Sequence, residues 1–134
     1  MKKPIAIAAA LIVSGAGPAC AHHSLAPFNR SVSRTIKGTV KSFNWSNPHV
    51  RLVVVVEDGS GAAKVWDFEG GSVNRLANSG FNRSTVSPGD KVSVIYNPKR
   101  DGSIGGFFVG VKTPSGKTYN LERSGPGRGG AEVS

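Results

Sequence analysis

The sequence predicts an all-β domain with one short helix. Three observations lead to this prediction. Most of the chain alternates apolar and polar residues with a period of two, turn residues such as glycine, proline and asparagine separate these runs, and one central stretch has helical spacing instead. The chain has 134 residues, of which 38% are hydrophobic, and this length suits a single domain. We therefore expect one core.

Residues 1–21 are expected to be a secretory signal peptide. Residues 2 and 3 are lysines, an apolar run covers residues 5–13, and the tripeptide "ACA" at 19–21 has the small-residue pattern of a cleavage site. The apolar run is too short for a permanent membrane helix, and no later segment approaches the roughly 18 to 20 apolar residues that a transmembrane segment needs. The sequence thus predicts a periplasmic protein that begins at His22 after cleavage.

Cys20 is the only cysteine, so the chain has no disulfide framework. Cleavage after Ala21 would remove this cysteine with the leader. The alternative is a lipoprotein in which Cys20 is the lipidated first residue. Gly17 and Pro18 fit the apolar-then-small pattern of such sites poorly, so we favour cleavage after Ala21.

The mature chain is expected to be moderately basic. Of the 17 Lys and Arg residues, two lie in the leader, which leaves 15 basic against 8 acidic residues and a net charge of +7. These basic residues are spread along the chain without a run of five or six, and export separates the protein from most nucleic acid. We therefore expect a solvated basic surface and no nucleic-acid partner.

The barrel domain is expected at residues 35–121, after an N-terminal segment at 22–34. Its first strands are expected at residues 35–45, 49–58 and 64–70. In the first of them the apolar positions change parity between Val40 and Phe43, which predicts a β-bulge near Lys41 and Ser42. Hairpin-like connections would make these strands an antiparallel meander.

A helix of about two turns is expected next, because Ser72 can cap it and Val73, Leu76 and Ala77 follow helical spacing. Gly80 suits the left-handed conformation that ends a helix. A turn is then expected at residues 88–90, followed by a strand with Val92, Val94 and Tyr96 on one side, a strand at 105–112 and a shorter one at 117–121. Residues 122–134 have the glycine-rich, polar composition of a disordered tail.

Three strands, a helix and then two strands is the element order of the OB-fold, a small Greek-key barrel. The sequence therefore predicts an OB-fold-like barrel of five to six strands. A β-sandwich is the alternative, since the order of elements does not fix their pairing. Barrel closure is favoured because a domain this small must protect its sheet edges.

The chain also resembles a known family through several stretches. These are "AHHSLAPF", "GTVKSFNWSNPHV", "WDFEGGSVNRLANSGFNRSTVSPGDKV", "YNPKRDGSIGG" and "GKTYNL". Together they resemble the DUF6152 family of small exported bacterial proteins, and the combination of "HHS" with "NPHV" is the most specific part. The resemblance implies an OB-like domain that carries a signal peptide, and no assigned function. Phe81 stands where the resemblance leads us to expect a tryptophan.

The candidate metal ligands are His22, His23 and His49, the only histidines of the chain. Cleavage after Ala21 would give His22 a free amine beside its imidazole, and His23 can add a second imidazole. Amine and imidazole nitrogens in a planar arrangement suit Cu(II), so copper is the expected metal. The amine must lose a proton to bind, so affinity should fall in acid. The alternative is that His22 and His23 are only solvated and that His49 hydrogen-bonds to a turn. The resemblance to the DUF6152 family favours a metal site over this alternative.

Other chemical features have structural explanations. Phe43, Trp45, Trp66 and Phe68 could form a base-stacking platform, but filling the core of a small barrel explains them better. The glycine-rich stretches lack phosphate-loop spacing, and no serine lies in a nucleophile pattern. We expect no enzymatic activity.

The predicted function is that of a periplasmic binding or accessory protein that holds Cu(II). The alternative is a metal-free module that recognises a protein or envelope ligand.

Overall fold

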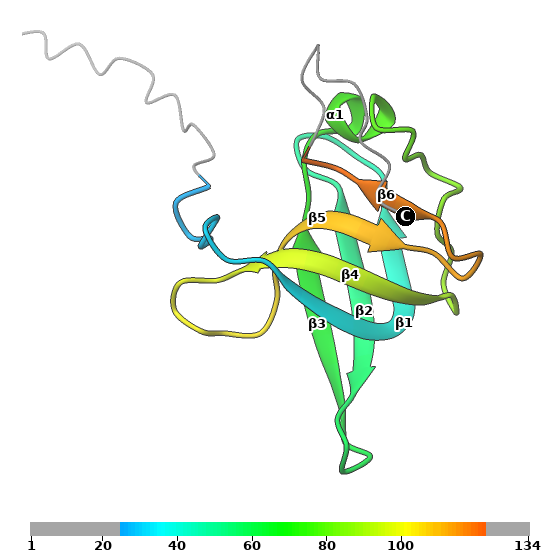
Figure 1. Cartoon of the computed structure of the whole chain (residues 1–134). Coiled ribbons are helices and arrows are strands. Elements are labelled where there is room, and N and C mark those ends of the chain that lie inside the picture. Colours follow the sequence, from blue (N-terminus) through cyan, green and yellow to red (C-terminus); the bar gives the residue numbers. More distant parts are fainter. Residues whose placement is uncertain (1–24, 123–134) are drawn as a thin grey trace, which may run out of the picture.

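The protein is described by a computed structural model over residues 25–122 (Figure 1). It is an all-β domain with one short helix, as the sequence predicts. The elements are β1 (Arg34–Asn44), β2 (Arg51–Glu57), β3 (Ala63–Glu69), α1 (Val73–Ala77), β4 (Lys91–Pro98), β5 (Gly106–Lys112) and β6 (Thr118–Asn120). No helix in this part of the chain is long and apolar enough to span a membrane.

The first three strands form the expected antiparallel meander. β1 pairs with β2, and β2 pairs with β3. The register between β1 and β2 shifts between Val40 and Ser42, which confirms the bulge predicted at this point. The second strand begins at Arg51, so His49 precedes it in the connection between β1 and β2.

A closed barrel results from the pairing of the remaining strands. β4 pairs with β1 on one side and with β5 on the other, and β5 pairs in parallel with β3. Following the neighbours around the barrel gives β1, β2, β3, β5, β4 and again β1. With a helix between β3 and β4, this is the topology of an OB-fold. β6 is an additional strand on the free side of β5.

Two consecutive glycines make the contact between β3 and β5 sterically possible. Gly105 has φ +104°, and a Cβ atom there would lie 2.4 Å from the carbonyl oxygen of Asp67. A Cβ atom at Gly106 would lie 2.5 Å from the carbonyl oxygen of Asn97 on β4. Any side chain at either position would force β5 away from one of its neighbours.

The main core fills the barrel, and α1 covers one of its ends. Leu52, Val54, Phe68 and Val94 are fully buried on the inner faces of the strands. Leu76 is the buried residue of α1 and packs into the same core. As predicted, Ser72 caps this helix by accepting a hydrogen bond from the backbone N–H of Arg75, and Gly80 adopts a positive φ beyond its end.

Residues 25–33 pack against the outside of the barrel and form a second, smaller core. Phe28 is 6% exposed and contacts Phe107 of β5, with a ring-centroid distance of 5.5 Å. Asn97 of β4 holds the same segment, because its Nδ2 donates a hydrogen bond of 2.9 Å to the carbonyl of Val32. The segment ahead of β1 is therefore part of the folded domain.

The loop between β4 and β5, residues 99–105, has internal hydrogen bonds that fix its shape. The carboxylate of Asp101 accepts bonds from the backbone N–H and the hydroxyl of Ser103, at 2.9 and 2.7 Å. The backbone N–H of Arg100 also donates to the carbonyl of Pro27, which ties the loop to the N-terminal segment. In Figure 1 this loop projects to the lower left, away from α1.

We predict that Gly105→Ala lowers the free energy of unfolding by about 2 kcal/mol or more, because the new Cβ meets a backbone oxygen at a positive φ. Gly59→Ala is the matched control. A Cβ at Gly59 meets nothing within 4 Å, and Gly59 is not among the positive-φ glycines of residues 25–122, so this change should be neutral or slightly stabilising. Urea unfolding of both variants measures the difference. Equal stabilities would show that barrel closure does not depend on Gly105.

We predict that Ser103→Ala raises the pKa of Asp101 part of the way to its ordinary value. The pKa of Asp101 is lowered first by the backbone N–H of Ser103 and then by its hydroxyl, and the substitution removes only the hydroxyl. Because this pKa is lower in the folded than in the unfolded protein, the ionised carboxylate stabilises the fold at pH values above the ordinary pKa of a carboxyl. This stabilisation is lost as the pH falls through the lowered pKa and the carboxylate becomes protonated. Carboxyl carbon NMR titration measures the shift. The pKa of Asp58, which Ser60 lowers in the same way, should not change.

Candidate functional site

Of the three candidate metal ligands, His49 lies in the part of the chain that the structure describes. His22 and His23 lie outside the described residues. His49 is in the connection between β1 and β2, beside α1 at the upper end of the barrel (Figure 1). Its side chain is 22% exposed, so one part of the imidazole is packed and another part reaches the surface.

The imidazole of His49 is oriented by the end of β3. Its Nδ1 lies 3.0 Å from the carbonyl oxygen of Gly70 and 3.3 Å from Oε1 of Glu69. A carbonyl oxygen can only accept, so Nδ1 is the donor in this hydrogen bond. In the neutral ring the lone pair therefore belongs to Nε2. This arrangement, with one ring nitrogen donating to a carbonyl or carboxylate, is typical of histidines that bind a metal.

The motif "NPH" joins the loop before β2 to the segment that leads into α1. Oδ1 of Asn47 accepts a hydrogen bond of 3.0 Å from the backbone N–H of Val73, the first residue of the helix. Val50 exchanges backbone hydrogen bonds with Gly70 and Gly71. His49 lies between these two attachments, so its backbone is held on both sides.

The described residues do not by themselves complete a metal site. Within residues 25–122, no three His, Cys, Asp or Glu side chains are grouped so that they could hold a metal ion. The start of the described chain does lie near the end of the barrel that carries His49. Leu25 and Gly71 line the same small cavity, and Gly71 is hydrogen-bonded to Val50, the neighbour of His49.

The carboxylates of β3 have structural partners. Asp67 forms an ion pair with Arg51 of β2, and both side chains are about half exposed. Glu69 lies beside His49, as described above. The contact of Glu69 and Gly70 with His49 joins residues about twenty positions apart, so no local sequence pattern reveals it.

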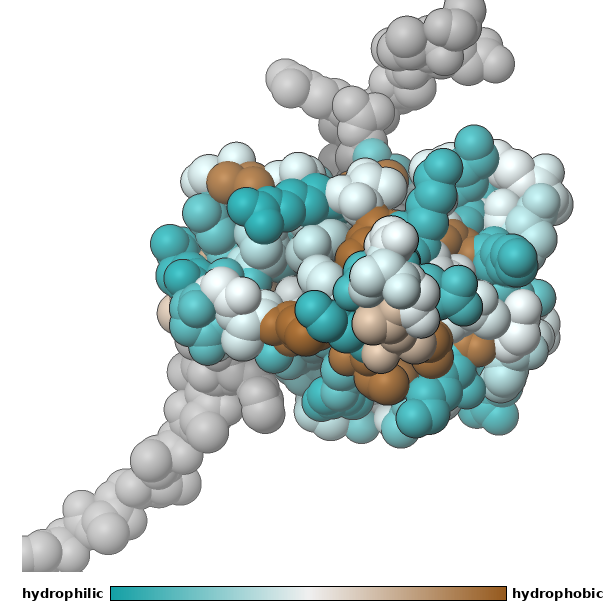
Figure 2. All heavy atoms as spheres, turned by 90° about the horizontal axis from the view of Figure 1, so that it is seen from below, coloured by the Kyte–Doolittle hydropathy of each residue, from teal (hydrophilic) through white to brown (hydrophobic). Residues whose placement is uncertain are grey.

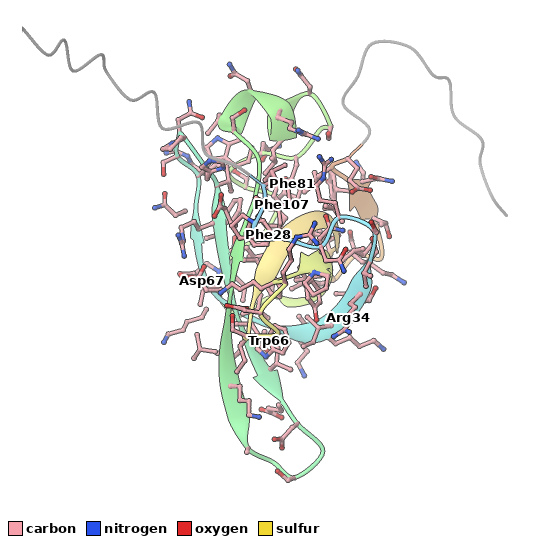
Figure 3. All side chains as sticks on the ribbon, turned by 90° about the vertical axis from the view of Figure 1, so that its left-hand side faces the viewer. Phe28, Arg34, Trp66, Asp67, Phe81 and Phe107 are labelled. Atoms are coloured by element: carbon pink, nitrogen blue, oxygen red, sulfur yellow. The ribbon has the colours of Figure 1, made fainter. Side chains whose placement is uncertain are left out.

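The aromatic residues pack together rather than forming an exposed stacking platform. Phe68 is fully buried, and Phe43 and Trp45 pack against Phe81 at centroid distances of 5.7 and 6.3 Å. The side chain of Phe81 is itself fully buried, so this position belongs to the core. Trp66 also packs on the core, and it is partly exposed at the lower end of the barrel (Figure 3). Filling the core is therefore the correct interpretation for this group.

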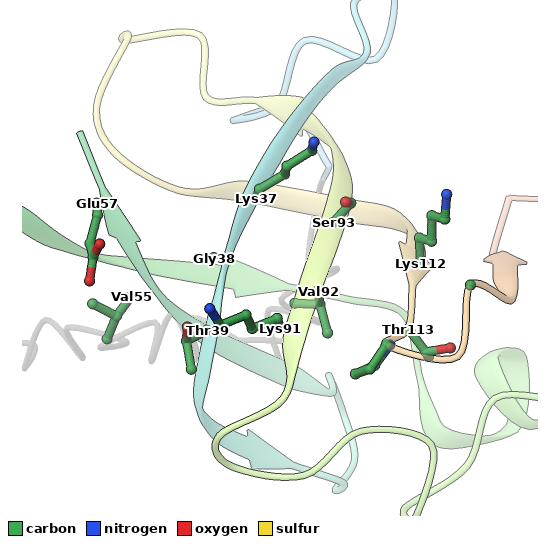
Figure 4. Close-up of a pocket in the computed structure, with 12 residues that line it drawn as sticks. Lys37, Gly38, Thr39, Val55, Glu57, Lys91, Val92, Ser93, Lys112 and Thr113 are labelled. Carbon is green, nitrogen blue, oxygen red and sulfur yellow. The ribbon is translucent and has the colours of Figure 1, made fainter. Parts of the chain in front are cut away.

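A wide groove lies on the outer face of β1, β4 and β5 (Figure 4). It has a volume of about 600 Å³, and Lys37, Lys91 and Lys112 are among the residues that line it. Ser93 pairs with Lys37 on one side and with Lys112 on the other, so these three side chains form one row across the strands. The groove has hydroxyl groups and short apolar side chains between its cations, and it contains no aromatic residue.

The family of the chain follows from its sequence match. The model of DUF6152, a family of unknown function, matches residues 9–108. The chain belongs to this family. The match includes all three histidines and extends from the predicted leader to β5. A comparison with curated proteins finds no match.

Two similar solved structures are crystal structures of the mitochondrial single-stranded DNA-binding protein Rim1 from S. cerevisiae. The first has a TM-score of 0.48 and 10% identity, covering 62% of this chain and 93% of that chain. The second, from selenomethionine-labelled protein, has a TM-score of 0.45 and 12% identity, covering 66% and 96%. The OB-type topology of the present chain is established by its own strand order and pairing.

We predict that His49→Ala lowers the free energy of unfolding by about 1 kcal/mol in the absence of metal, because it leaves the carbonyl of Gly70 without this hydrogen bond. The measurement is urea unfolding in the presence of a chelator. Lys41→Ala, an exposed position, is the control and should change the value by less than about 0.5 kcal/mol. Equal stabilities of the two variants would show that the bond to Gly70 does not hold His49.

Proposed function

We propose that the protein is an exported, periplasmic OB-like binding or accessory protein that holds Cu(II) at its mature amino terminus. The ligands are the amine and imidazole of His22, supported by His23 and His49. Cu(II) prefers nitrogen ligands of this kind in a planar arrangement and has the highest affinity among the common divalent metals. The proposed role is binding, because no serine of the sequence lies in a nucleophile pattern and the histidines are assigned to the metal.

The observation that carries the proposal is the orientation of His49. Its Nδ1 donates to the carbonyl of Gly70, 3.0 Å away, with Oε1 of Glu69 at 3.3 Å. This contact selects the tautomer whose Nε2 carries the lone pair that a metal requires. The fold thus prepares one nitrogen ligand in advance.

The position of Leu25 supports the remaining ligands. His22 precedes Leu25 by three residues, so covalent geometry keeps their Cα atoms within about 11 Å. Leu25 shares a small cavity with Gly71, whose carbonyl accepts a hydrogen bond from the residue after His49. Residue 22 is therefore tied by a short chain to Leu25, which lines a cavity on the side of the domain that carries His49, and this supports including His49 in the proposed site.

We predict that an extra alanine before His22 lowers Cu(II) affinity at least about tenfold, since it replaces the terminal amine by an amide that must lose a proton to bind. His49→Ala should weaken binding separately. The measurement is titration of Cu(II) into chains whose first residue is verified by intact mass. Affinity should also fall between pH 8 and pH 6, as the amine becomes protonated.

Two results would contradict the proposal. Equal affinity of the native and extended chains would exclude the amino-terminal amine, and unchanged affinity of His49→Ala would remove that residue from the site. His49→Gln is the matched variant, because it retains a polar side chain but has no imidazole. If neither change affects Cu(II) binding, a metal-free module that recognises a protein or envelope ligand becomes the better account.

A further inference from the structure

The end of the barrel remote from α1 has an open mouth with an aromatic wall. Arg34, the first residue of β1, is the cross-strand partner of Tyr96 on β4. Directly paired residues of antiparallel strands point to the same face, and Tyr96 is buried in the core. Arg34 therefore extends from the inner face of β1 at the rim. Figure 3 shows it beside Trp66 at the lower end of the barrel.

Trp66 and Tyr96 form the inner wall of this mouth. Their rings meet edge to face with a centroid distance of 5.7 Å, and Trp66 also stacks on Phe68 at 5.9 Å and an interplanar angle of 25°. Because the rings support one another, their positions are fixed by packing. Trp66 is partly exposed, so it presents aromatic surface to an incoming molecule.

The loop 99–105 and the segment before β1 complete the enclosure. The resulting pocket has a volume of about 470 Å³, within the range of sites for small organic ligands. Its apolar lining includes Val32, Pro98 and Ile104 in addition to the aromatic wall. Ile104 is 44% exposed, one of two large hydrophobic side chains with such exposure among residues 25–122. Seen from below, the face that includes the tip of the β2–β3 hairpin is mostly hydrophilic, with apolar side chains in its middle (Figure 2).

The charged groups of the pocket are mostly cations. Arg34, Lys99 and Arg100 line it, and no acidic residue does. Nε of Arg100 donates to the carbonyl of Ala26, so this guanidinium is partly committed to the fold. Arg34 and Lys99 form no ion pair within residues 25–122. Asp101, the carboxylate of the loop, accepts hydrogen bonds from Ser103 and also interacts electrostatically with Lys99.

We propose that this mouth binds a small organic anion with a flat, aromatic body. The ring of the ligand lies against Trp66 and Tyr96, and its carboxylate or sulfonate lies between Arg34 and Lys99. Aromatic contact and charge complementarity occur together here, whereas the groove of Figure 4 has cations without an aromatic wall. The enclosure by two loops favours a small molecule over an extended chain.

This site is independent of the proposed copper site. The connection that contains His49 lies beside α1, whereas loop 99–105 and the start of β1, which line the pocket, lie to the left in Figure 1, away from α1. The two sites share no residue. Loss of copper binding would therefore leave this proposal intact, and failure of this proposal would say nothing about copper.

We predict that 2-naphthalenesulfonate binds the purified protein at least about tenfold more tightly than the neutral 2-naphthylmethanol, because only the anion gains the two cations. Arg34→Gln and Lys99→Gln should each weaken the sulfonate about three- to tenfold and leave the neutral compound unchanged. Lys37→Gln, three residues along β1 and outside the pocket, is the matched control and should have no effect. Calorimetric titration measures all of these affinities.

Fluorescence locates the bound probe. The chain has two tryptophans, so Trp45→Phe leaves Trp66 as the single reporter, and Trp66→Phe leaves Trp45. Quenching by the sulfonate should occur in the first variant and be largely lost in the second. Equal binding of the charged and neutral compounds, an equal effect of Lys37→Gln, or quenching of Trp45 alone would each overturn the proposal. Tighter binding of a thymidine oligonucleotide at the same residues would assign the mouth to nucleic acid instead.

Discussion

The structure depends on the short parallel contact between β3 and β5, where Phe68 and Glu69 pair with Gly106 and Phe107. Without it the strands would form an open, curled sheet with β3 as an exposed edge. The contact consists of two residue pairs, and Gly105 and Gly106 leave room there for the backbone carbonyl groups of Asp67 on β3 and Asn97 on β4. Closure then places the buried side chains of five strands around one core.

Closure also creates two barrel ends with different chemistry. At one end α1 and the "NPH" loop are joined by hydrogen bonds, and they leave the imidazole of His49 at the surface with one nitrogen already bonded. At the other end no helix covers the core, so part of Trp66 is reached from solvent beside Arg34 and Lys99, which form no ion pair within residues 25–122. The same strands thus support a candidate ligand for a metal and a candidate pocket for an organic anion.

The fold was largely predictable from the sequence, whereas the sites were only partly predictable. Strand periodicity, the change of parity after Val40 and the cap at Ser72 are local signals, and the structure agrees with each of them. The contact of His49 with Gly70 joins distant positions, and its geometry depends on strand pairing that no local pattern reveals. Arg34 likewise looks like an ordinary polar residue before a strand, until its pairing with Tyr96 places it at the barrel mouth.

The small cavity beside α1 has a consequence for how the chain could be rearranged. Leu25 and Glu122, the first and last described residues, both line it. A short linker between them would therefore bridge little distance, and new termini could be opened in the exposed turn at 58–62, which connects β2 to β3. Such a circular permutant, limited to residues 25–122, would retain every strand pairing of the barrel while opening the chain at the tip of the β2–β3 hairpin, so that barrel closure could be studied with the breaks in the chain moved.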